Sequence, residues 1–367
     1  MSPRRRVAVS QMVSPARALA FEILLAVARG GYASDLLAAR SEGLDSRDAG
    51  LATEIVFGVL RCQAQLDYLI EHYSAKPAAR LDEPVLVALR MGVYQLRYIE
   101  RIPPHAAVSE SVELIKRARK RSAAGFANAV LRKVDRTPVP WPDPAVELSH
   151  PAWLLERWER QYGPQTAAAI AQANLRTPET YVNVTTGRIQ DIGSQSIVPL
   201  LRLEPGQTFL DLCAAPGNKT AQALQHGVRA VACDIHLHRL KPLRNLGIDL
   251  VVLDATRPLP FRRRFDRILI DAPCSGTGTL ARNPEIKWRL RPSDLPDLHS
   301  RQVALLEHGR RALAPGGLLL YSTCSLEHEE NEDVVANVPA PLVLETMRRI
   351  PGLQPGDGFF AAVIKSE

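Results

Sequence analysis

At 367 residues, with 46% hydrophobic and 23% charged residues, the chain is long enough to bury a substantial core, and its length predicts about two domains. A formal charge of +7 makes RNA a candidate partner, although many basic proteins bind no nucleic acid. The five cysteines are scattered and lack the spacing that zinc prefers, so we expect a reducing compartment and no structural metal. No apolar run reaches the ~18 residues that span a bilayer, which predicts a cytoplasmic protein without membrane contact.

The first 136 residues have no convincing strand pattern. Residues 1–13 are typical of a flexible basic tail. Ser14 is a candidate cap and Pro15 suits the first turn of a helix that Gly30-Gly31 ends. Ser46 is a candidate cap for a second helical pattern over residues 46–60, and further patterns cover residues 84–98, 105–119 and 123–134. Residues 14–136 are therefore predicted to form an all-α domain.

This domain carries one conspicuous charge cluster, Lys116-Arg117-Ala118-Arg119-Lys120-Arg121, at the end of a helical pattern. Cations suit the negative end of a helix dipole whatever the function of the helix. They also suit RNA phosphates. Charge alone favours neither a solvated helix end nor a phosphate-contacting patch.

Residues 137–151 are rich in proline around Trp141, which is typical of a stiff linker and predicts a domain boundary. A helical stretch over 152–174 follows and leads to the short segments 181–184 and 192–195. We expect Trp153 and Trp158 to pack inside the protein rather than to stack on bases.

After Pro205-Gly206 strands alternate with helical lengths. The expected strands cover residues 208–212, 230–234, 250–254, 267–271 and 317–322. This alternation predicts a parallel, doubly wound sheet. Residues 341–347 and 359–365 are too close together for a crossover helix, so we expect them to form an antiparallel hairpin at the edge. The predicted fold class is thus an all-α domain followed by an α/β sheet of Rossmann type.

Four of these strands bring an acid to or near their carboxyl end, namely Asp211, Asp234, Asp254 and Asp271. One such acid is commonly an incidental helix cap, but a repeated acid along one edge indicates a ligand site. The turn after the first strand contains small residues and a glycine, which let backbone N–H groups approach a ligand. It matches neither the dinucleotide pattern GxGxxG nor the nucleoside-triphosphate pattern GxxxxGK[ST]. The turn together with Asp234 resembles an S-adenosylmethionine site.

A second constellation pairs Cys274, after one strand, with Cys324, after a strand expected to be its neighbour. Either cysteine alone is more often a small buried residue than a nucleophile. Two thiols at neighbouring strand ends beside a methyl-donor site favour a nucleophilic role instead. A thiolate that adds to carbon 6 of a pyrimidine makes carbon 5 nucleophilic enough to take a methyl group. Such chemistry also needs a carboxyl group at the base edge and a base held out of its stack.

Four motifs carry a resemblance to a known family: Asp211-Leu-Cys-Ala-Ala-Pro-Gly-Asn-Lys-Thr220, Asp271-Ala-Pro-Cys-Ser-Gly276, Arg282-Asn-Pro-Glu-Ile-Lys-Trp288 and Tyr321-Ser-Thr-Cys-Ser325. Together they resemble the RNA (cytosine-5) methyltransferases of the Sun and nucleolar-protein family. Ile102-Pro-Pro-His-Ala-Ala-Val108 and Phe126-Ala-Asn-Ala-Val-Leu-Arg132 resemble the antitermination-factor-like RNA-binding domain of its bacterial branch, the small-subunit ribosomal RNA methyltransferases of type B. The resemblance extends from about Ala16 to the end of the chain.

The resemblance implies a role for particular residues. The methionine part of S-adenosylmethionine would lie against the turn formed by Cys213, Ala214, Ala215, Pro216, Gly217, Asn218 and Lys219. Asp234 would bind the ribose, Asp254 the adenine ring, and Asp271 both the donor and the cytosine edge. Cys324 would be the nucleophile and Cys274 would assist release of the product. Lys287 matches the active-site region of the family, although a surface lysine in a salt bridge is the alternative.

Three departures from the family pattern stand out. Asn218 occupies the place of a second glycine, which would strain the turn modestly if that residue needs a positive φ. Residues 137–190 are interpreted as a linker and a shortened RNA-contacting lobe, because the stretch from Asn183 to Gln195 is much shorter than in the family. The segment after Asp333 is also short, while residues 191–367 keep the methyltransferase motifs.

The sequence therefore predicts an S-adenosylmethionine-dependent RNA cytosine-5 methyltransferase that acts on small-subunit ribosomal RNA as a monomer. A non-catalytic RNA-binding or ribosome assembly factor that retains the fold is the main alternative. A DNA cytosine-5 methyltransferase is a third. It is disfavoured because such enzymes use the thiol of the Pro-Cys motif, here Cys274, and would not need Cys324.

Overall fold

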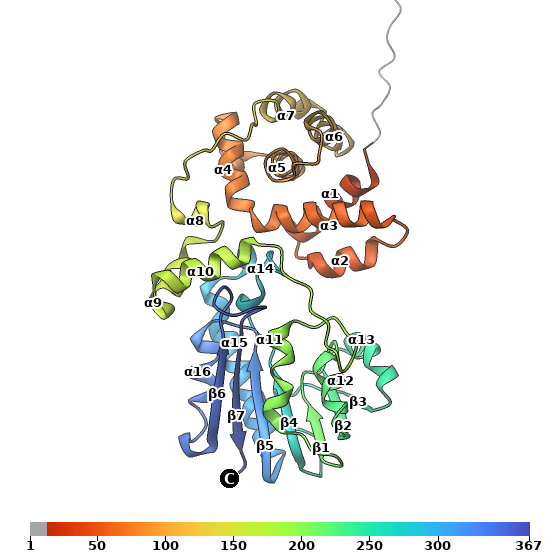
Figure 1. Cartoon of the computed structure of the whole chain (residues 1–367), viewed down its shortest axis with the longest axis vertical. Coiled ribbons are helices and arrows are strands. Elements are labelled where there is room, and N and C mark those ends of the chain that lie inside the picture. Colours follow the sequence, from red (N-terminus) through yellow and green to blue (C-terminus); the bar gives the residue numbers. More distant parts are fainter. Residues whose placement is uncertain (1–12) are drawn as a thin grey trace, which may run out of the picture. The chain divides into compact units, whose positions relative to one another are not determined.

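The computed structural model describes residues 13–367, and its chain divides into two compact units (Figure 1). The first comprises Met1–Gly163 together with Asn283–Trp288, and the second comprises Pro164–Arg282 together with Arg289–Glu367. The basic tail predicted over residues 1–13 lies outside the described residues, apart from Val13, which is buried.

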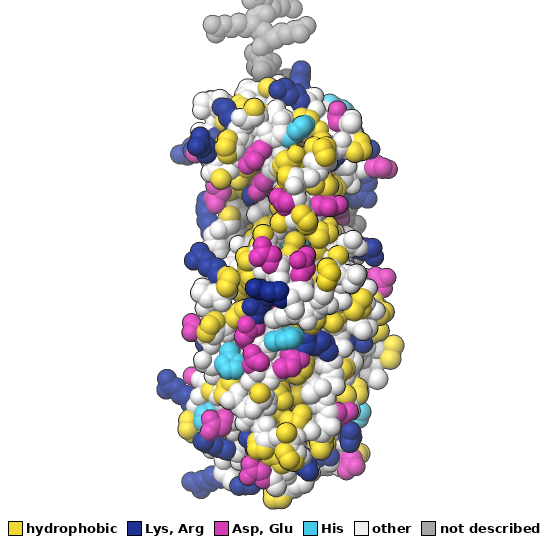
Figure 2. Space-filling model, turned by 90° about the vertical axis from the view of Figure 1, so that its left-hand side faces the viewer, with side chains coloured by type: hydrophobic (Ala, Val, Ile, Leu, Met, Phe, Trp, Pro, Cys, Tyr) yellow, Lys and Arg dark blue, Asp and Glu magenta, His cyan; other side chains and the backbone are white. Residues whose placement is uncertain are grey.

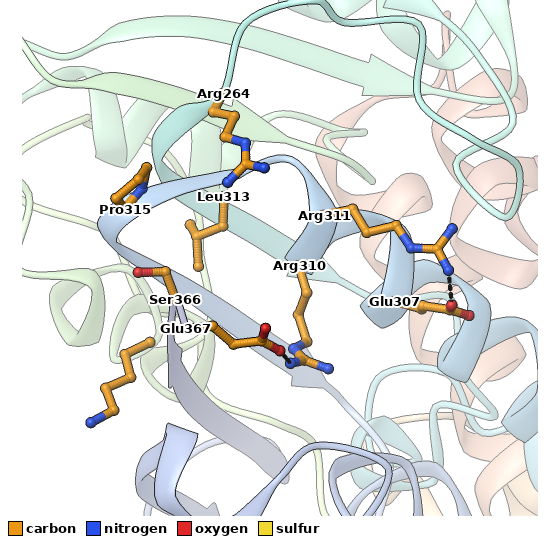
Figure 3. Close-up of a pocket in the computed structure, with 9 residues that line it drawn as sticks. Arg264, Glu307, Arg310, Arg311, Leu313, Pro315, Ser366 and Glu367 are labelled. Atoms are coloured by element: carbon orange, nitrogen blue, oxygen red, sulfur yellow. Dashed lines mark hydrogen bonds and ion pairs between the residues drawn. The ribbon is translucent and has the colours of Figure 1, made fainter.

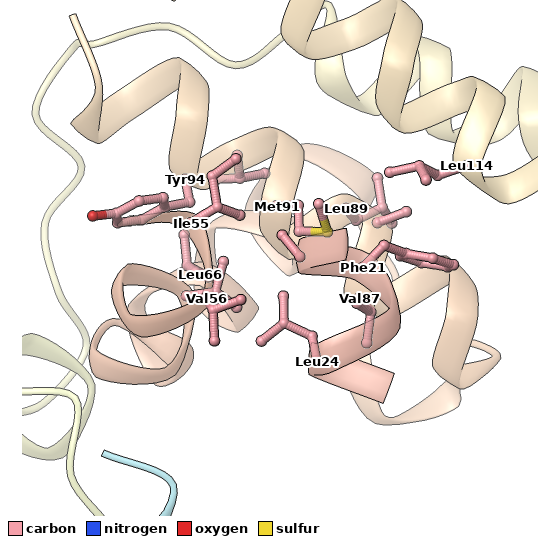
Figure 4. Close-up of a cluster of buried hydrophobic side chains, with 14 of the residues drawn as sticks. Phe21, Leu24, Ile55, Val56, Leu66, Val87, Leu89, Met91, Tyr94 and Leu114 are labelled. Carbon is pink, nitrogen blue, oxygen red and sulfur yellow. The ribbon is translucent and has the colours of Figure 1, made fainter. Parts of the chain in front are cut away.

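The first unit is helical, as the apolar periodicity predicted. Its helices are α1 (Pro15–Ala28), α2 (Ala33–Arg40), α3 (Ser46–Arg61), α4 (Gln63–Ser74), α5 (Glu83–Tyr98), α6 (Pro104–Arg117), α7 (Ala124–Leu131), α8 (Pro144–Glu147) and α9 (Ala152–Tyr162). Helix α5 packs against α1, α3, α4, α6 and α7. Its buried Leu89 and Met91 lie among Phe21, Ile55 and Leu114 of the surrounding helices (Figure 4). Burial of this apolar core holds the unit together.

Two predicted helix caps differ from the observed ones. The Ser14 side chain makes no capping bond to α1; its backbone nitrogen and Oγ donate to Glu110 Oε2 at 2.8 and 2.7 Å. Helix α3 begins at Ser46, but its cap is Asp45, whose carboxylate accepts from the Asp48 nitrogen at 2.7 Å. A long-range partner at Ser14 therefore replaces the local bond that the sequence suggested.

The helical stretch expected over 152–174 is broken in two at Gly163. This residue has a φ of +82°, which glycine adopts without the usual steric cost, and α10 (Pro164–Leu175) starts immediately after it. The two compact units also divide at this point. The proline-rich stretch before it packs with the helical unit, where Gln65 Nε2 donates to the Glu147 carbonyl at 2.5 Å.

The second unit contains a seven-stranded sheet. Its strands are β1 (Thr208–Asp211), β2 (Arg229–Asp234), β3 (Asp249–Val252), β4 (Phe265–Asp271), β5 (Leu313–Thr323), β6 (Val343–Arg349) and β7 (Phe359–Lys365). They lie in the order β3-β2-β1-β4-β5-β7-β6. The first five strands are mutually parallel, and β7 pairs antiparallel with both β5 and β6. The predicted fold class, including the antiparallel edge hairpin, is confirmed.

Apolar layers cover both faces of this sheet. One face packs against α15 (Leu295–Arg311) and α16 (Glu332–Val335), through residues such as Leu305 and Val334. The other packs against α12 (Asn218–Leu224) and the short helical turn Val198–Leu201. Shorter helices α11 (Ile192–Gln195), α13 (Leu237–Leu240) and α14 (Ile286–Arg289) lie in the connections. With both faces covered, ligands must approach the ends of the strands.

Acidic and basic side chains are interspersed over the face of the protein shown in Figure 2. The formal charge of +7 therefore does not gather into one continuous basic patch on that face. Within the cluster at the end of α6, Lys116 pairs with Glu113 at 3.1 Å and Lys120 pairs with Asp82 at 3.0 Å. Part of the charge of this cluster is thus neutralised locally.

Candidate active site

The carboxyl ends of the central parallel strands meet at one edge of the sheet. Strand β1 lies between β2 and β4, and β5 follows β4. The register sets Asp211 beside Leu269 of β4, and Asp271 beside Ser322 of β5. Asp234 closes β2 in the same direction. The acids predicted at strand ends therefore reach one edge, where open α/β sheets bind their ligands.

The turn between β1 and α12 depends on a glycine. Gly217 has a φ of +104°, and a Cβ atom there would lie 2.7 Å from Leu243 Cγ. Asn218 is the first residue of α12 and has no positive φ, so the strain considered for it does not arise. Its Nδ2 donates to the Ile189 carbonyl at 3.2 Å, and its Oδ1 accepts from Arg188 Nη1 at 3.4 Å. Asn218 thus ties this turn to the shortened segment that precedes the sheet.

Asp211 faces the interior and supports the same turn. Its Oδ2 accepts from Thr220 Oγ1 at 2.7 Å and its Oδ1 from the Cys213 nitrogen at 3.3 Å. Burial raises the pKa of this carboxyl to about 7. Burial also raises the pKa of the Cys213 thiol, so this cysteine is not an activated nucleophile.

Asp234 and Asp254 each accept local hydrogen bonds. Asp234 is buried, and its Oδ1 accepts from the His236 nitrogen at 2.9 Å. Strand β3 ends at Val252, two residues earlier than Asp254, whose Oδ1 accepts from the nitrogen and Oγ1 of Thr256 at 3.0 and 2.6 Å. The bond from the Thr256 side chain is the main cause that lowers the Asp254 pKa. In each case the other carboxylate oxygen forms a longer ion pair with an arginine. The distance is 3.7 Å for Asp234 and 3.4 Å for Asp254.

Large apolar side chains stand exposed beside these two acids. They are Ile235, Leu237 and Val252, each about half exposed. Leaving aliphatic side chains in water costs free energy that a flat apolar ligand covering them would recover. This pairing of acids with an open apolar surface suits a nucleoside, because the acids can accept from hydroxyl and amino groups.

The two predicted thiols lie in contact. Cys274 follows β4, Cys324 follows β5, and their Sγ atoms are 3.4 Å apart. Both side chains are only partly buried by surface area. The hydrogen bond with Cys324, together with burial, raises the pKa of Cys274 well above its ordinary value. The two sulfurs are close enough to share a proton, and either can be its donor.

Asp271 links the thiols to the cofactor turn. Its Oδ2 accepts from Lys219 Nζ at 2.6 Å, and its Oδ1 accepts from Ser322 Oγ at 3.0 Å. The Asp271 side chain remains about 30% exposed. A carboxylate has roughly four acceptor positions, so it can still accept a hydrogen bond from a ligand. The ion pair with Lys219 was not anticipated from sequence, because the two residues are 52 positions apart.

Arg282, in one of the family motifs, holds two buried acids. Its Nη2 donates to Asp191 Oδ2 and its Nε to Asp357 Oδ2, both at 2.9 Å. Burial and the neighbouring Asp191 raise the Asp357 pKa to about 7, while Arg282 acts in the opposite direction. The guanidinium thus fastens the start of the methyltransferase unit to the segment before β7.

Glu330 is a second residue that sequence reasoning did not select. It is fully buried, and its carboxylate accepts hydrogen bonds from Ser275 and Ser325, the residues directly after the two thiols. The only sequence signal is an acid-rich segment, Glu327-Glu330, that follows a thiol motif.

Lys287 belongs to the helical unit. Its side chain is fully buried, and Nζ donates to the Arg61 carbonyl at 2.9 Å. The adjacent Trp288 donates its Nε1 to the Leu60 carbonyl at 2.8 Å. These bonds make Lys287 an anchor of its segment rather than a surface lysine in a salt bridge. The catalytic role expected for Lys287 stays a prediction.

A separate pocket lies at the opposite edge of the sheet, around the start of β5 and the end of β7 (Figure 3). Arg310 pairs there with Glu367 at 2.8 Å, and Arg311 pairs with Glu307. It holds none of the predicted site residues. Across residues 13–367, no helix has the length and hydropathy that a bilayer crossing requires. No three His, Cys, Asp or Glu side chains in that range are grouped to hold a metal ion.

Three family models match the chain. Residues 198–342 match "16S rRNA methyltransferase RsmB/F", residues 14–136 match "NusB family", and residues 150–191 match the ferredoxin-like domain of RsmF/B-like methyltransferases. The first covers most of the sheet and both thiols. The third match is only a short segment, in the region where the lobe was expected to be reduced.

Curated relatives match the chain over most of its length. The chain is 30% identical to the probable ribosomal RNA small subunit methyltransferase B of Bacillus subtilis, over 87% of each protein. It is 31% identical to ribosomal RNA small subunit methyltransferase B of Klebsiella pneumoniae, over 92% of this chain and 94% of the relative. The latter alignment spans 408 positions, more than the 367 residues of this chain, so parts of the relative have no counterpart here. The crystal structure of PH0851 shares the fold, with a TM-score of 0.78 and 20% identity over 97% of this chain and 100% of that one.

Proposed function

Because this chain belongs to the ribosomal RNA small subunit methyltransferase B family and is thus an S-adenosylmethionine-dependent rRNA methyltransferase, we propose that it methylates carbon 5 of a cytosine through a covalent adduct with Cys324. Small-subunit ribosomal RNA is the proposed substrate. The observation that carries the cytosine-5 assignment is the contact of two thiols, 3.4 Å apart, at the strand ends beside Asp271. Methylation of a base nitrogen or a ribose oxygen needs no such pair.

In the proposed first step, the deprotonated sulfur of Cys324 bonds to carbon 6 of the cytosine. The electron pair of the C5–C6 double bond then makes carbon 5 nucleophilic. Carbon 5 bonds to the methyl carbon as the S–CH3 bond of the sulfonium breaks, and the sulfur retains that electron pair as a neutral thioether. A base next removes the proton from carbon 5, the C5–C6 double bond re-forms, and the C6–S bond breaks to return the Cys324 thiolate. Cys274 assists this release.

The chain has residues that fit the methyl donor. When bound, S-adenosylmethionine supplies an electrophilic methyl group. The turn from Cys213 to Lys219 would hold its methionine part. Gly217 gives this turn its shape, because its φ is +104° and a Cβ there would lie 2.7 Å from Leu243 Cγ. Asp234 would accept from the ribose hydroxyls and Asp254 from the adenine amino group. The exposed Ile235, Leu237 and Val252 would cover the adenine faces.

Asp271 would orient the target base. Its Oδ1 and Oδ2 are each engaged by one neighbour, and the carboxylate keeps acceptor positions for the exocyclic amino group of cytosine. A base can meet these groups only outside its stack, so substrate binding must include extrusion of the nucleotide. Lys219 would keep Asp271 oriented during this step, since it holds the carboxylate from the cofactor side.

The raised pKa of Cys274 supports the division of roles between the thiols. A thiol whose pKa is raised is a poor attacking group, which leaves Cys324, whose sulfur lies 3.4 Å away, as the proposed nucleophile. The helical unit, which matches the NusB family, would contribute RNA contacts. A ribosomal substrate fits the cytoplasmic location predicted from the sequence.

The test uses the purified protein with methyl-labelled donor and small-subunit ribosomal RNA from cells that lack the enzyme, both as naked RNA and as subunits. We expect 5-methylcytosine in the product, and bisulfite sequencing will locate it. Transfer to another atom would refute the proposal. Failure with naked RNA and with subunits alike would favour the non-catalytic assembly factor.

Three cysteine variants test the roles of the thiols. Cys324→Ala should abolish transfer, and Cys274→Ala should accumulate a covalent protein–RNA adduct that is visible on denaturing gels. Cys62→Ala, which removes a buried thiol of the helical unit, is the matched control and should behave as wild type. If the outcomes for Cys324 and Cys274 were exchanged, the assignment of nucleophile and release thiol would be wrong.

A further inference from the structure

A buried carboxylate joins the two loops that carry the thiols. Glu330 has no exposed surface and ends the short helical turn His328–Glu330 after the second thiol loop. Its Oε1 accepts from the Ser275 nitrogen at 2.8 Å, and its Oε2 accepts from Ser325 Oγ at 2.5 Å. The Ser275 hydroxyl also donates to Oε2. Since Ser275 follows Cys274 and Ser325 follows Cys324, the Glu330 side chain is hydrogen-bonded to both loops at the residues next to the two cysteines.

A third element fixes the carboxylate itself. Gln302 of α15 donates its Nε2 to Glu330 Oε1 at 3.0 Å and to the Pro273 carbonyl at 2.9 Å. The Tyr321 hydroxyl of β5 donates to the Glu330 backbone carbonyl at 2.6 Å. Glu330 therefore cannot shift without moving both thiol loops and the helix behind them.

The next residue, Asn331, braces the nucleophile loop alone. Its Oδ1 accepts from Thr323 Oγ1 at 2.5 Å, and its Nδ2 donates to the Ser325 carbonyl at 2.9 Å. Thr323 and Ser325 are the two neighbours of Cys324. Asn331 thus shapes one loop, whereas Glu330 bonds to both. Ser275 Oγ and Ser325 Oγ, 3.0 Å apart, also join the loops, and so does Thr277 Oγ1, which accepts from the Leu326 nitrogen at 2.9 Å.

Burying a carboxyl group is costly unless hydrogen bonds replace the lost water. Here four bonds from three side chains and one backbone N–H satisfy it. An apolar residue could fill the same space at less cost, but it could not hold two loops at a set separation. The placement of the four donors therefore points to a geometric role.

We infer that Glu330 is a positioning residue that sets the separation of Cys274 and Cys324, so that release of the product follows attack without delay. This inference rests on the proposed function, in which both thiols serve one cytosine. Reacting groups must be held close to their productive geometry, and an error of about 1 Å can lower a rate by about 10²-fold. The absence of this carboxylate should thus slow turnover while leaving the donor site intact.

Two substitutions separate the role of the carboxylate from simple stabilisation. Glu330→Ala removes the hydrogen bonds that the Glu330 carboxylate accepts from the two thiol loops. Glu330→Gln keeps an oxygen for the Ser275 nitrogen and Gln302, and its amide can donate to the two hydroxyls, which can act as acceptors. We expect Glu330→Ala to lower kcat by about 10²-fold with an unchanged KM for S-adenosylmethionine. Glu330→Gln should restore most of the rate. Asp333→Asn, which neutralises an exposed acid nearby, is the matched control and should match wild type.

A second readout needs no RNA. A trivalent phenylarsenical bridges two thiols only when they lie close together, and peptide mass spectrometry identifies the bridged pair. Wild type should be bridged between Cys274 and Cys324, Glu330→Gln likewise, and Glu330→Ala much more slowly. If Glu330→Ala does not fold, Ser275→Ala removes one of the bonds to Oε2 and should show a smaller loss in both assays.

Equal bridging and equal kcat in Glu330→Ala and wild type would overturn the inference. So would a loss in Glu330→Ala that Glu330→Gln does not reverse, because a negative charge would then matter rather than the loop connection. If wild type itself makes no 5-methylcytosine, the proposed function fails. Rapid bridging in Glu330→Ala would refute the positioning role independently of that result.

Discussion

Replacement of Lys287 by methionine should change how the stability of the protein depends on pH. The Lys287 amine is fully buried, donates to the Arg61 carbonyl at 2.9 Å, and lies 5.0 Å from the centre of the Trp288 ring. Burial is the largest cause that lowers its pKa to about 7; Arg61 lowers it further and Cys62 acts in the opposite direction. His150 is also buried near this amine. Methionine has similar length, needs no hydrogen bond and does not titrate.

The sign follows from where the proton is bound. In the unfolded chain a lysine titrates near pH 10.4, so between about pH 7 and 10 the unfolded state binds a proton that the folded state does not. The free energy of unfolding of wild type therefore rises with pH across this window, and this gain is lost below about pH 7. At 1.36 kcal/mol per unit, the shift amounts to roughly 4 to 5 kcal/mol in total. The lost bond to Arg61 costs the variant about 1 to 2 kcal/mol at every pH.

Urea unfolding at pH 7, 8 and 9 in reducing buffer, followed by far-UV circular dichroism, measures the difference between wild type and Lys287→Met. We expect the variant to be at least as stable as wild type at pH 7. As the pH rises, the free energy of unfolding of wild type should increase by up to about 1.4 kcal/mol per pH unit relative to that of the variant. For Lys133→Met, at an exposed lysine of the same unit, the free energy of unfolding should depend on pH as it does in wild type. Parallel curves for Lys287→Met would mean that the buried amine keeps its charge, and the reasoning from burial would fail.

Three further substitutions test the cofactor turn and the Arg282 cluster. Gly217→Ala places a Cβ at a φ of +104°, 2.7 Å from Leu243. The substitution should lower the free energy of unfolding by about 1 to 3 kcal/mol and weaken S-adenosylmethionine binding measured by calorimetry. Unchanged binding would contradict the close fit of this turn. Arg282→Lys cannot hold Asp191 and Asp357 together, so it should lower the free energy of unfolding by about 3 kcal/mol in urea titrations, and a neutral effect would show that the two bonds are dispensable. The free energy of unfolding of wild type should fall relative to that of Asp357→Asn as the pH rises from about 4 to 7. The Asp357 pKa is raised to about 7, so in this range the folded state holds a proton that the unfolded state has released. Equal pH profiles for the two proteins would refute this.

The sequence was sufficient to predict the sheet and its ligand edge. Apolar runs that end on acids, such as the one ending at Asp271, predict buried strands with polar carboxyl ends, and the register confirms the arrangement. The same logic brought Cys274 and Cys324 to neighbouring strands. Their separation of 3.4 Å could not be predicted, because it depends on how two loops pack.

Other features depended on partners that are distant in sequence. Ser14 satisfies the pattern of a helix cap, but Glu110, 96 positions away, takes its hydrogen bonds. Lys287 matched a catalytic motif, while its partner carbonyl lies 226 positions earlier. Glu330 contacts Ser275 across 55 positions. Gly163, by contrast, precedes a proline and was a readable sign of a helix break.

The six residues Asn283–Trp288 also bear on how this protein could have evolved. They lie between stretches of the methyltransferase unit in the chain, yet they supply Lys287 and Trp288 to carbonyls of the helical unit. A gene fragment that encodes only residues 1–163 would lack both donors. An exchange of the helical unit between homologous genes would therefore need three crossovers, one after residue 163 and one on each side of residues 283–288, to carry these donors along. A single crossover after residue 163 would instead separate the helical unit from two of its own hydrogen-bond donors.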